Sequence, residues 1–183
     1  MKVLLHSCCA PCASYCVPRL KELGHEVEML FSNSNIDSES EFARRLESAR
    51  RLAAEEGVEL VVDEYDHRRW LEEVAAGYEG EREKGERCRR CFAYNLARAE
   101  EFARLRGAEA FTTSLTVSPH KVSGDIFSAN ASGNFLKEDF KKRGGFLCSV
   151  KRAKELGLYR QDYCGCEFSK RDAGALRVAP DRV

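Results

Sequence analysis

The chain has 183 residues, of which 43% are hydrophobic and 33% are charged, so it is long and apolar enough to fold as one domain and is not intrinsically disordered. No apolar run approaches the roughly 20 residues that cross a bilayer. The run at residues 3–5 is also too short for the apolar core of an export signal, so we expect a cytoplasmic protein.

The net charge is zero, from 30 basic and 30 acidic side chains, but the charges are unevenly distributed. Residues 39–86 carry 8 Lys/Arg and 15 Asp/Glu, whereas residues 137–183 carry 12 and 7. The basic C-terminal segment suits a polyanion such as RNA. From the charge alone, however, ordinary solvated surfaces are the better explanation.

Strands and helices alternate along the chain. The pattern predicts, in order, a strand at 2–5, a loop at 6–12, a helix ending at Leu23, a strand at 26–31, a helix at 38–57, a strand at 58–62, a helix capped by Asp66, a loop at 77–87, a helix from Cys88 to Arg106, a strand at 110–115, a helix at 122–133, a short strand at 135–136 and a helix at 146–156. Pro18 marks either a kink or the true start of its helix. Residues 1–172 are expected to form a single α/β domain, and residues 173–183 a flexible tail.

This alternation predicts an α/β fold with a parallel sheet and right-handed crossovers. In such sheets, ligands bind at the carboxyl ends of the strands. Asn33, Asn35 and the segments 111–115 and 118–121 follow predicted strands. Their polar groups are therefore candidates to hold a substrate, although a capped loop explains the two segments equally well.

Nine cysteines suggest metal or redox chemistry, because a cytosolic chain rarely keeps disulfides. Cys8, Cys9 and Cys12 share the loop at a predicted helix start, which acidifies thiols. Cys88 and Cys91 form a second group at another helix start. Four thiolates at one place suit a zinc site or an iron–sulfur cluster, and buried cysteines without metal are the third alternative.

Adjacent cysteine side chains diverge, so Cys8 and Cys9 are difficult to place on one small ion. A multi-iron cluster accommodates them better, unless one of the two faces a different metal or the substrate. Cys164 and Cys166 are separated by one glycine, which allows a strained, reducible disulfide. Two further metal ligands or two inert thiols are equally compatible with that spacing. The remaining cysteines, Cys16 and Cys148, are expected in the core.

Together these segments resemble the QueH-type epoxyqueuosine reductases. The resemblance rests on His6-Ser-Cys-Cys-Ala-Pro-Cys12, Phe31-Ser-Asn-Ser-Asn-Ile36, Gly85-Glu-Arg-Cys-Arg-Arg-Cys-Phe92, Phe111-Thr-Thr-Ser-Leu-Thr-Val-Ser-Pro119, Asp139-Phe-Lys-Lys-Arg-Gly-Gly145 and Gly157-Leu-Tyr-Arg-Gln-Asp-Tyr-Cys-Gly-Cys166. They occur in this order between residues 3 and 169. The family more often has Tyr-Asn-Pro-Asn at residues 32–35 and Asp-Phe-Arg at residues 139–141, and neither departure removes a cysteine.

The resemblance implies an oxidoreductase that reduces epoxyqueuosine at the wobble position of a tRNA to queuosine, without cobalamin, in the last step of queuosine biosynthesis. It implies a HUP-like (adenine nucleotide alpha-hydrolase-like) Rossmann-type fold. It also implies a [4Fe-4S] cluster bound by Cys8, Cys9, Cys88 and Cys91, with Cys164 and Cys166 as a redox-active pair. The partners would be the anticodon loop of the tRNA and an electron donor that the sequence does not identify; nor does it give the oligomeric state.

The chemistry of the residues agrees with this resemblance. A low-potential cluster supplies single electrons, and breaking a carbon–oxygen bond also requires a Lewis acid or a proton donor. A second metal held by Cys12 and Asp139 would meet that need, although a carboxylate beside a basic run is also typical of the surface. The candidates to neutralise anticodon phosphates are Arg87, Arg89, Arg90, Lys141, Lys142 and Arg143. Tyr159 or Tyr163 would stack a splayed base.

Two other functions compete with this interpretation. A zinc-stapled RNA-binding module without catalysis would need four closed thiolate ligands and no redox pair. A nucleotide-activating ligase of the same fold class would need a Gly/Ser-rich phosphate loop, which residues 6–12 lack.

Overall fold

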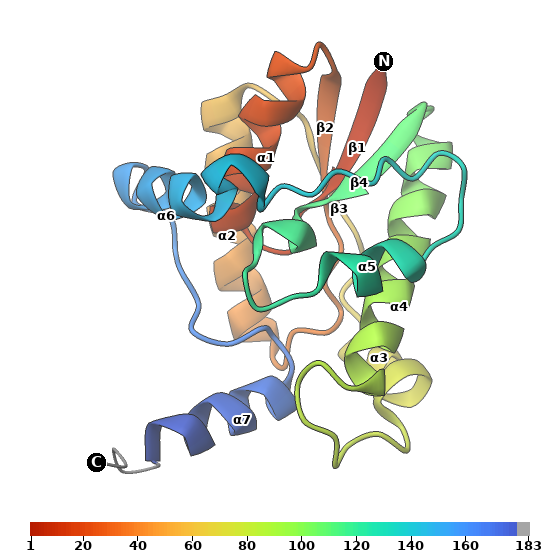
Figure 1. Cartoon of the computed structure of the whole chain (residues 1–183), viewed down its shortest axis with the longest axis vertical. Coiled ribbons are helices and arrows are strands. Elements are labelled where there is room, and N and C mark those ends of the chain that lie inside the picture. The colour runs from red at the N-terminus through yellow and green to blue at the C-terminus, as the bar shows by residue number, and fades with distance from the viewer. Residues whose placement is uncertain (179–183) are drawn as a thin grey trace.

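The computed structural model describes residues 1–178, with side chains described through residue 174. It shows a four-stranded sheet in the order β3-β2-β1-β4, with helices on both faces (Figure 1). The strands are β1 (Lys2–His6), β2 (Glu26–Phe31), β3 (Leu60–Val62) and β4 (Ala110–Thr113). The helices are α1 (Ala10–Glu22), α2 (Glu39–Glu56), α3 (His67–Trp70), α4 (Glu86–Leu105), α5 (Ser123–Ser128), α6 (Gly145–Glu155) and α7 (Glu167–Val178), joined by a π-helical turn η1 (Leu71–Ala75) and 3₁₀ turns η2 (Ser114–Val117) and η3 (Lys142–Gly144).

The sheet is parallel at every pairing, which confirms the predicted α/β class. Val3 in the central strand pairs with Val27 on one side and Ala110 on the other. The apolar residues 3–5 are fully buried, as expected for a strand covered on both faces. Figure 1 shows α1, α2 and α6 on one face, and α4 with α5 on the other. The carboxyl ends of β1, β2 and β4 therefore share one edge.

Helix α1 begins earlier than predicted, inside the segment expected to be a loop. Its N-cap is Cys9, and Pro11 lies in the first turn, where the missing N–H removes no helical hydrogen bond. Pro18 lies inside the helix and does not start it. Cys12 consequently belongs to the first turn of α1, one turn from Cys9.

The predicted capping box confirms the start of α2. The Ser38 side chain accepts a hydrogen bond from the Glu41 backbone N–H at 3.3 Å. Gly57 ends the helix with a φ of 59°, in the left-handed region that glycine adopts without strain. This helix matches the range predicted from the sequence.

The two elements predicted within residues 122–136 are shorter in the structure than expected. The helix α5 ends at Ser128, because the Asn130 side chain accepts from the Ser132 backbone N–H at 2.8 Å and competes with helical hydrogen bonding. The expected strand at 135–136 is reduced to one isolated bridge between Phe135 and Phe111. The segment still lies beside β4, since the Leu136 N–H donates to the Phe111 carbonyl at 2.8 Å.

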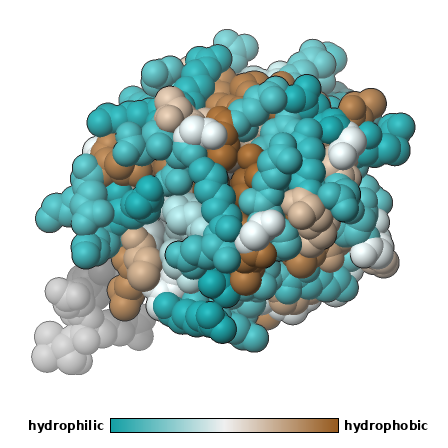
Figure 2. Space-filling view, turned by 90° about the horizontal axis from the view of Figure 1, so that it is seen from above, coloured by the Kyte–Doolittle hydropathy of each residue, from teal (hydrophilic) through white to brown (hydrophobic). Residues whose placement is uncertain are grey.

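The described part of the chain ends in a helix, α7, where the sequence predicted none. Residues 173–178 of the predicted tail belong to α7, and residues 179–183 lie outside the described residues. Within residues 1–178, no helix is both long and apolar enough to cross a membrane. Figure 2 views the molecule from the end where the strands begin, and this face is largely hydrophilic with scattered apolar side chains.

Candidate active site

A cavity of about 480 Å³ opens at the carboxyl edge of the sheet, where a parallel α/β fold binds ligands. Its volume lies within the range of roughly 300–1,000 Å³ that small-molecule sites occupy. Six of the nine cysteines line it: Cys8, Cys9, Cys12, Cys88, Cys91 and Cys164. The structure thus brings together thiols from three distant segments of the chain.

The first thiol group follows β1. The sulfur atoms of Cys8, Cys9 and Cys12 all lie within 4.8 Å of one another, so together they can hold a metal ion. Hydrogen bonds from Cys12 and then Cys8 hold the pKa of the Cys9 thiol well below its usual range, despite burial. Ser114 fixes Cys8 in place, because its hydroxyl accepts from the Cys8 N–H at 3.0 Å and donates to the sulfur at 3.2 Å.

The second thiol group lies at the start of α4, which begins at Glu86, two residues before the predicted start. Cys88 Sγ accepts from the Lys84 backbone N–H at 3.3 Å, and Cys91 Sγ accepts from Asn95 Nδ2 at 3.7 Å. Burial raises the pKa of Cys88 to about 11 and that of Cys91 well above its usual range.

The third thiol group belongs to residues 157–166, which we call the strap. Cys166 and Cys91 of α4 pack in the same apolar cluster, so the end of the strap lies beside that helix. The thiols of Cys164 and Cys166 further raise the pKa of both cysteines in α4. Cys164 is exposed and lines the cavity, whereas Cys166 is 9% exposed and packs with Trp70.

Gly165 lies where the strap turns, and a larger residue there would force the Asn35 side chain to shift. The Gly165 φ of +159° lies at the limit of the region that favours glycine, and a Cβ there would come within 2.7 Å of Asn35 Nδ2. The Gly165 carbonyl accepts from the Asp37 N–H at 2.9 Å. Arg45 donates to the Cys164 carbonyl at 2.8 Å and lies over the Tyr163 ring at 5.0 Å. The strap is therefore fastened to α2 and to the loop before it.

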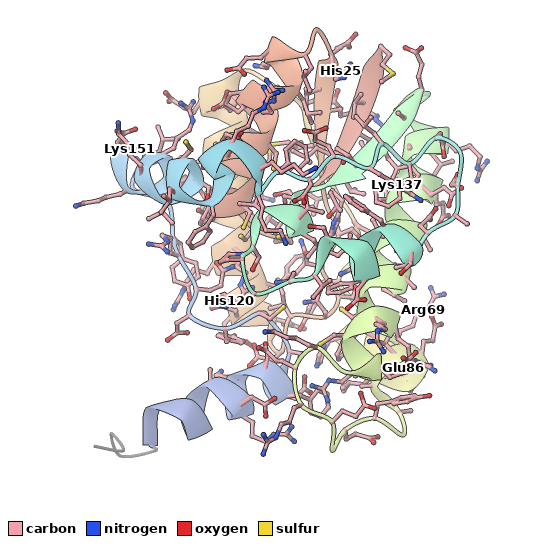
Figure 3. The ribbon with its side chains drawn as sticks, in the orientation of Figure 1. His25, Arg69, Glu86, His120, Lys137 and Lys151 are labelled. Carbon is pink, nitrogen blue, oxygen red and sulfur yellow. The ribbon has the colours of Figure 1, made fainter. Side chains whose placement is uncertain are left out.

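Several predicted polar residues are confirmed on the cavity wall. Asn33 and Asn35 come from the loop after β2, and Ser118, His120 and Lys121 follow η2. Figure 3 shows His120 at the carboxyl edge of the sheet, far from His25 at the opposite end. Burial alone would lower the pKa of Lys121, but the surrounding thiols raise it, so this side chain is a cation among sulfur atoms.

Other predicted residues lie elsewhere. Asp139 does not line the cavity, and its carboxylate accepts from the Lys141 backbone N–H at 3.3 Å. The prediction that Cys148 lies in the core is wrong, because this residue is exposed on α6. The same prediction for Cys16 is confirmed, since Cys16 is fully buried.

Two arginines expected to meet phosphates have structural partners instead. Arg87 is 1% exposed, donates to the carbonyls of Tyr78 at 2.8 Å and Glu81 at 2.6 Å, and lies 4.6 Å over the Phe168 ring. Arg90 donates to a backbone carbonyl of η1 and stacks on Tyr78 at 4.9 Å. Both hold the segment between η1 and α4 in place. Arg87 is too deeply buried to reach a phosphate, so that prediction is wrong, whereas phosphate binding by the half-buried Arg90 stays a prediction.

Three residues in or beside the site, Arg45, Asn95 and Gln161, were not predicted from the sequence. A signal existed for Asn95, which lies one helical turn after Cys91 and therefore on the same face of α4. A signal also existed for Arg45, which falls between Phe42 and Ala49 on the buried stripe of α2. Nothing in the sequence distinguishes Gln161 from an exposed loop residue.

Comparison with known proteins shows which family this chain matches. Residues 3–172 match the sequence profile of the family described as Epoxyqueuosine reductase QueH. Similar proteins carrying that same name include one from Dehalococcoides mccartyi, 37% identical over 92% of each chain. Others come from Streptococcus pyogenes, 33% identical over 94% of this chain and 71% of its own, and from Haemophilus influenzae, 33% identical over 99% and 76%.

Proposed function

The chain belongs to the epoxyqueuosine reductase QueH family, and from this membership we propose the reaction in detail: epoxyqueuosine at the wobble position of a tRNA is reduced to queuosine. The protein is an oxidoreductase of queuosine biosynthesis. The observation that carries the proposal is the gathering of six cysteines around one cavity of nucleoside-accommodating size. In the reaction, both carbon–oxygen bonds of the epoxide break and an alkene forms between the two carbons. Two electrons and two protons are consumed, and the oxygen leaves as water.

The residues present fit a [4Fe-4S] cluster, because the donors around the cavity are thiols. Cys8, Cys9, Cys88 and Cys91 would hold it, and all four line the same cavity. When bound, such a cluster supplies electrons one at a time at low potential. The family resemblance implies a reaction without cobalamin, and we include this in the proposal.

The departing oxygen needs a proton or a Lewis acid. Lys121 lies on the cavity wall beside the thiols, and we propose that its ammonium group hydrogen-bonds that oxygen and stabilises the negative charge that develops on it. Cys12, which completes the compact three-sulfur group, is left to hold a second metal. Asp139 stays the proposed carboxylate for that metal, and it would have to approach from outside the cavity lining.

We assign Cys164 and Cys166 to the resupply of electrons. The exposure of Cys164 supports this, because an electron donor can reach it while it faces the cavity. Replacing both cysteines by Ala should leave the iron and sulfide content unchanged and abolish multiple turnover, with single-turnover reduction retained. Loss of iron in this double variant would show instead that the pair ligates the metal.

The tRNA partner would reach the cavity mouth, where Arg89 and Tyr163 line the wall. Lys142 and Arg143 are exposed and remain candidates to meet phosphates. Figure 3 shows Lys137 and Lys151, two lysines of the basic C-terminal segment, on separate parts of the molecule. A tRNA substrate also supports a cytoplasmic location.

An assay of iron and acid-labile sulfide after anaerobic purification tests the proposal against a zinc-stapled RNA-binding module. The reductase should contain about four irons and four sulfides per chain. Zinc without sulfide, together with RNA binding, would favour the module.

A further inference from the structure

Three amide side chains on the cavity wall each bury a carbonyl oxygen without a hydrogen-bond partner. They are Asn35 after β2, Asn95 in α4 and Gln161 in the strap. Among the described side chains, no other amide oxygen is in this state, and all three line the same cavity. Asn35 and Asn95 are only 8% and 3% exposed. Because unpaired buried acceptors are costly, these oxygens indicate a ligand that carries hydrogen-bond donors.

The nitrogen end of two of these amides is occupied by a cysteine. Asn95 Nδ2 donates to Cys91 Sγ at 3.7 Å. The Gln161 side chain lies beside Cys9 and helps to lower the pKa of that thiol. A sulfur atom of this kind accepts hydrogen bonds, so the amide presents its NH₂ to the sulfur. The carbonyl oxygen must then point elsewhere, and it remains free for a ligand.

The third amide is oriented by the strap. Asn35 Nδ2 lies so close to the Gly165 backbone that a Cβ on that glycine would come within 2.7 Å of it. Its Oδ1 is left buried and unpaired. All three amides therefore direct their nitrogen ends at cysteine-bearing segments and offer only acceptors to the ligand.

We propose that Asn35, Asn95 and Gln161 form an acceptor wall that recognises the hydroxyl and ammonium donors of the modified base. The inference rests on the proposed function, since it assigns these donors to the substrate of that same cavity. In epoxyqueuosine, the cyclopentane ring carries hydroxyl groups and is joined to the base through a secondary amine, which is protonated at neutral pH. An unmodified guanosine at the same tRNA position offers none of these donors.

Such a wall distinguishes modified from unmodified tRNA. A site with buried acceptors binds a ligand lacking the donors poorly, because the acceptors are then left unpaired. The groups that make these contacts do not react. They hold the ring while its carbon–oxygen bonds face the thiols on the same wall.

The test measures equilibrium binding of two tRNAs to oxidised protein, which cannot turn over. One tRNA carries epoxyqueuosine, and the other carries guanosine at the same position. Replacing Asn35 or Gln161 by Leu should reduce the preference for the modified tRNA about 10-fold, with binding of the guanosine tRNA unchanged. Asn35→Asp is the matched control, because it keeps an acceptor oxygen and should keep the preference.

Iron and sulfide content, measured on every variant, shows that the site is intact. Leu variants that retain the unaltered protein's preference overturn the inference, and so does an Asp variant that loses it as completely as the Leu variant. If the unaltered protein reduces epoxyqueuosine and the Leu variants still discriminate, only the acceptor wall is wrong. If the unaltered protein neither reduces epoxyqueuosine nor prefers its tRNA, the proposed function fails together with the inference.

Discussion

Replacing Arg45 by Met should destabilise the protein and loosen the strap. Arg45 Nε donates to Glu41 Oε1 at 2.7 Å, and the two side chains are 1% and 9% exposed. Removing one partner of a buried ion pair typically costs about 3–5 kcal/mol. Glu41 keeps a hydrogen bond from the Tyr159 hydroxyl at 3.1 Å, so we expect a loss near the lower limit, about 3 kcal/mol.

Urea unfolding gives the free energy of unfolding for this comparison. Arg44→Met is the matched control, because the Arg44 side chain is 61% exposed and should contribute little. Adding Glu41→Gln to Arg45→Met should recover part of the loss, since no carboxylate is then left buried and unpaired. In the Arg45 variant, Cys166 should also react faster with an alkylating agent, because the hydrogen bond that holds the Cys164 carbonyl is lost. A loss below about 1 kcal/mol in the free energy of unfolding, or no recovery in the double variant, would refute the stabilising role of the buried Arg45–Glu41 ion pair.

Three further predictions follow from other parts of the molecule. Gly145→Ala should strongly lower the midpoint of thermal unfolding, because a Cβ on Gly145 would lie 1.8 Å from the Phe140 carbonyl oxygen. Gly124→Ala is the control and should leave the midpoint unchanged, because a Cβ there meets nothing within 4 Å. Equal midpoints for the two variants would contradict this prediction. Burial alone would raise the pKa of Asp63, but hydrogen bonds from Arg98 and Ser32 hold it below its usual range. The ionised Asp63 carboxylate should therefore stabilise the fold fully above about pH 4, and this stabilisation should be lost as the pH falls through the lowered pKa. Measured by urea unfolding, Asp63→Asn should lower the free energy of unfolding at pH 7 and change it little at pH 2. A difference between the two proteins that does not depend on pH would contradict this prediction. After anaerobic purification, the Cys88→Ala variant should lack iron and visible absorbance. The Cys148→Ala variant, changed at an exposed position, should retain iron and absorbance. If the two variants are bleached alike, or if neither is bleached, Cys88 is not a ligand of the cluster.

The parallel sheet was predictable because the relevant signals are local. The apolar run at residues 3–5, the Ser38 capping box and the helix-ending Gly57 each act within a few residues. The position of the site followed in turn, since cysteines and asparagines after predicted strands must meet at the carboxyl edge. Asn33 and Asn35 were placed correctly for this reason.

The remaining errors concern tertiary partners, which a single sequence does not display. Arg87 lies in a run of charges that suggests an exposed surface, yet the carbonyls of Tyr78 and Glu81 and the Phe168 ring enclose it. Cysteine is a residue type that is commonly buried, but Cys148 is exposed on α6. Asp139 is close to the basic run in sequence, which says nothing of its distance from the cavity.

The central claim is that the thiol-lined cavity reduces epoxyqueuosine within tRNA. In the most direct measurement, the anaerobically purified protein is incubated with a chemical reductant and tRNA bearing epoxyqueuosine. The tRNA is then digested, and its nucleosides are identified by mass spectrometry. We predict conversion of epoxyqueuosine to queuosine, a product lighter by one oxygen atom, and no conversion by the Cys88→Ala variant. Unchanged epoxyqueuosine, with a full complement of iron and sulfide in the protein, would contradict the claim.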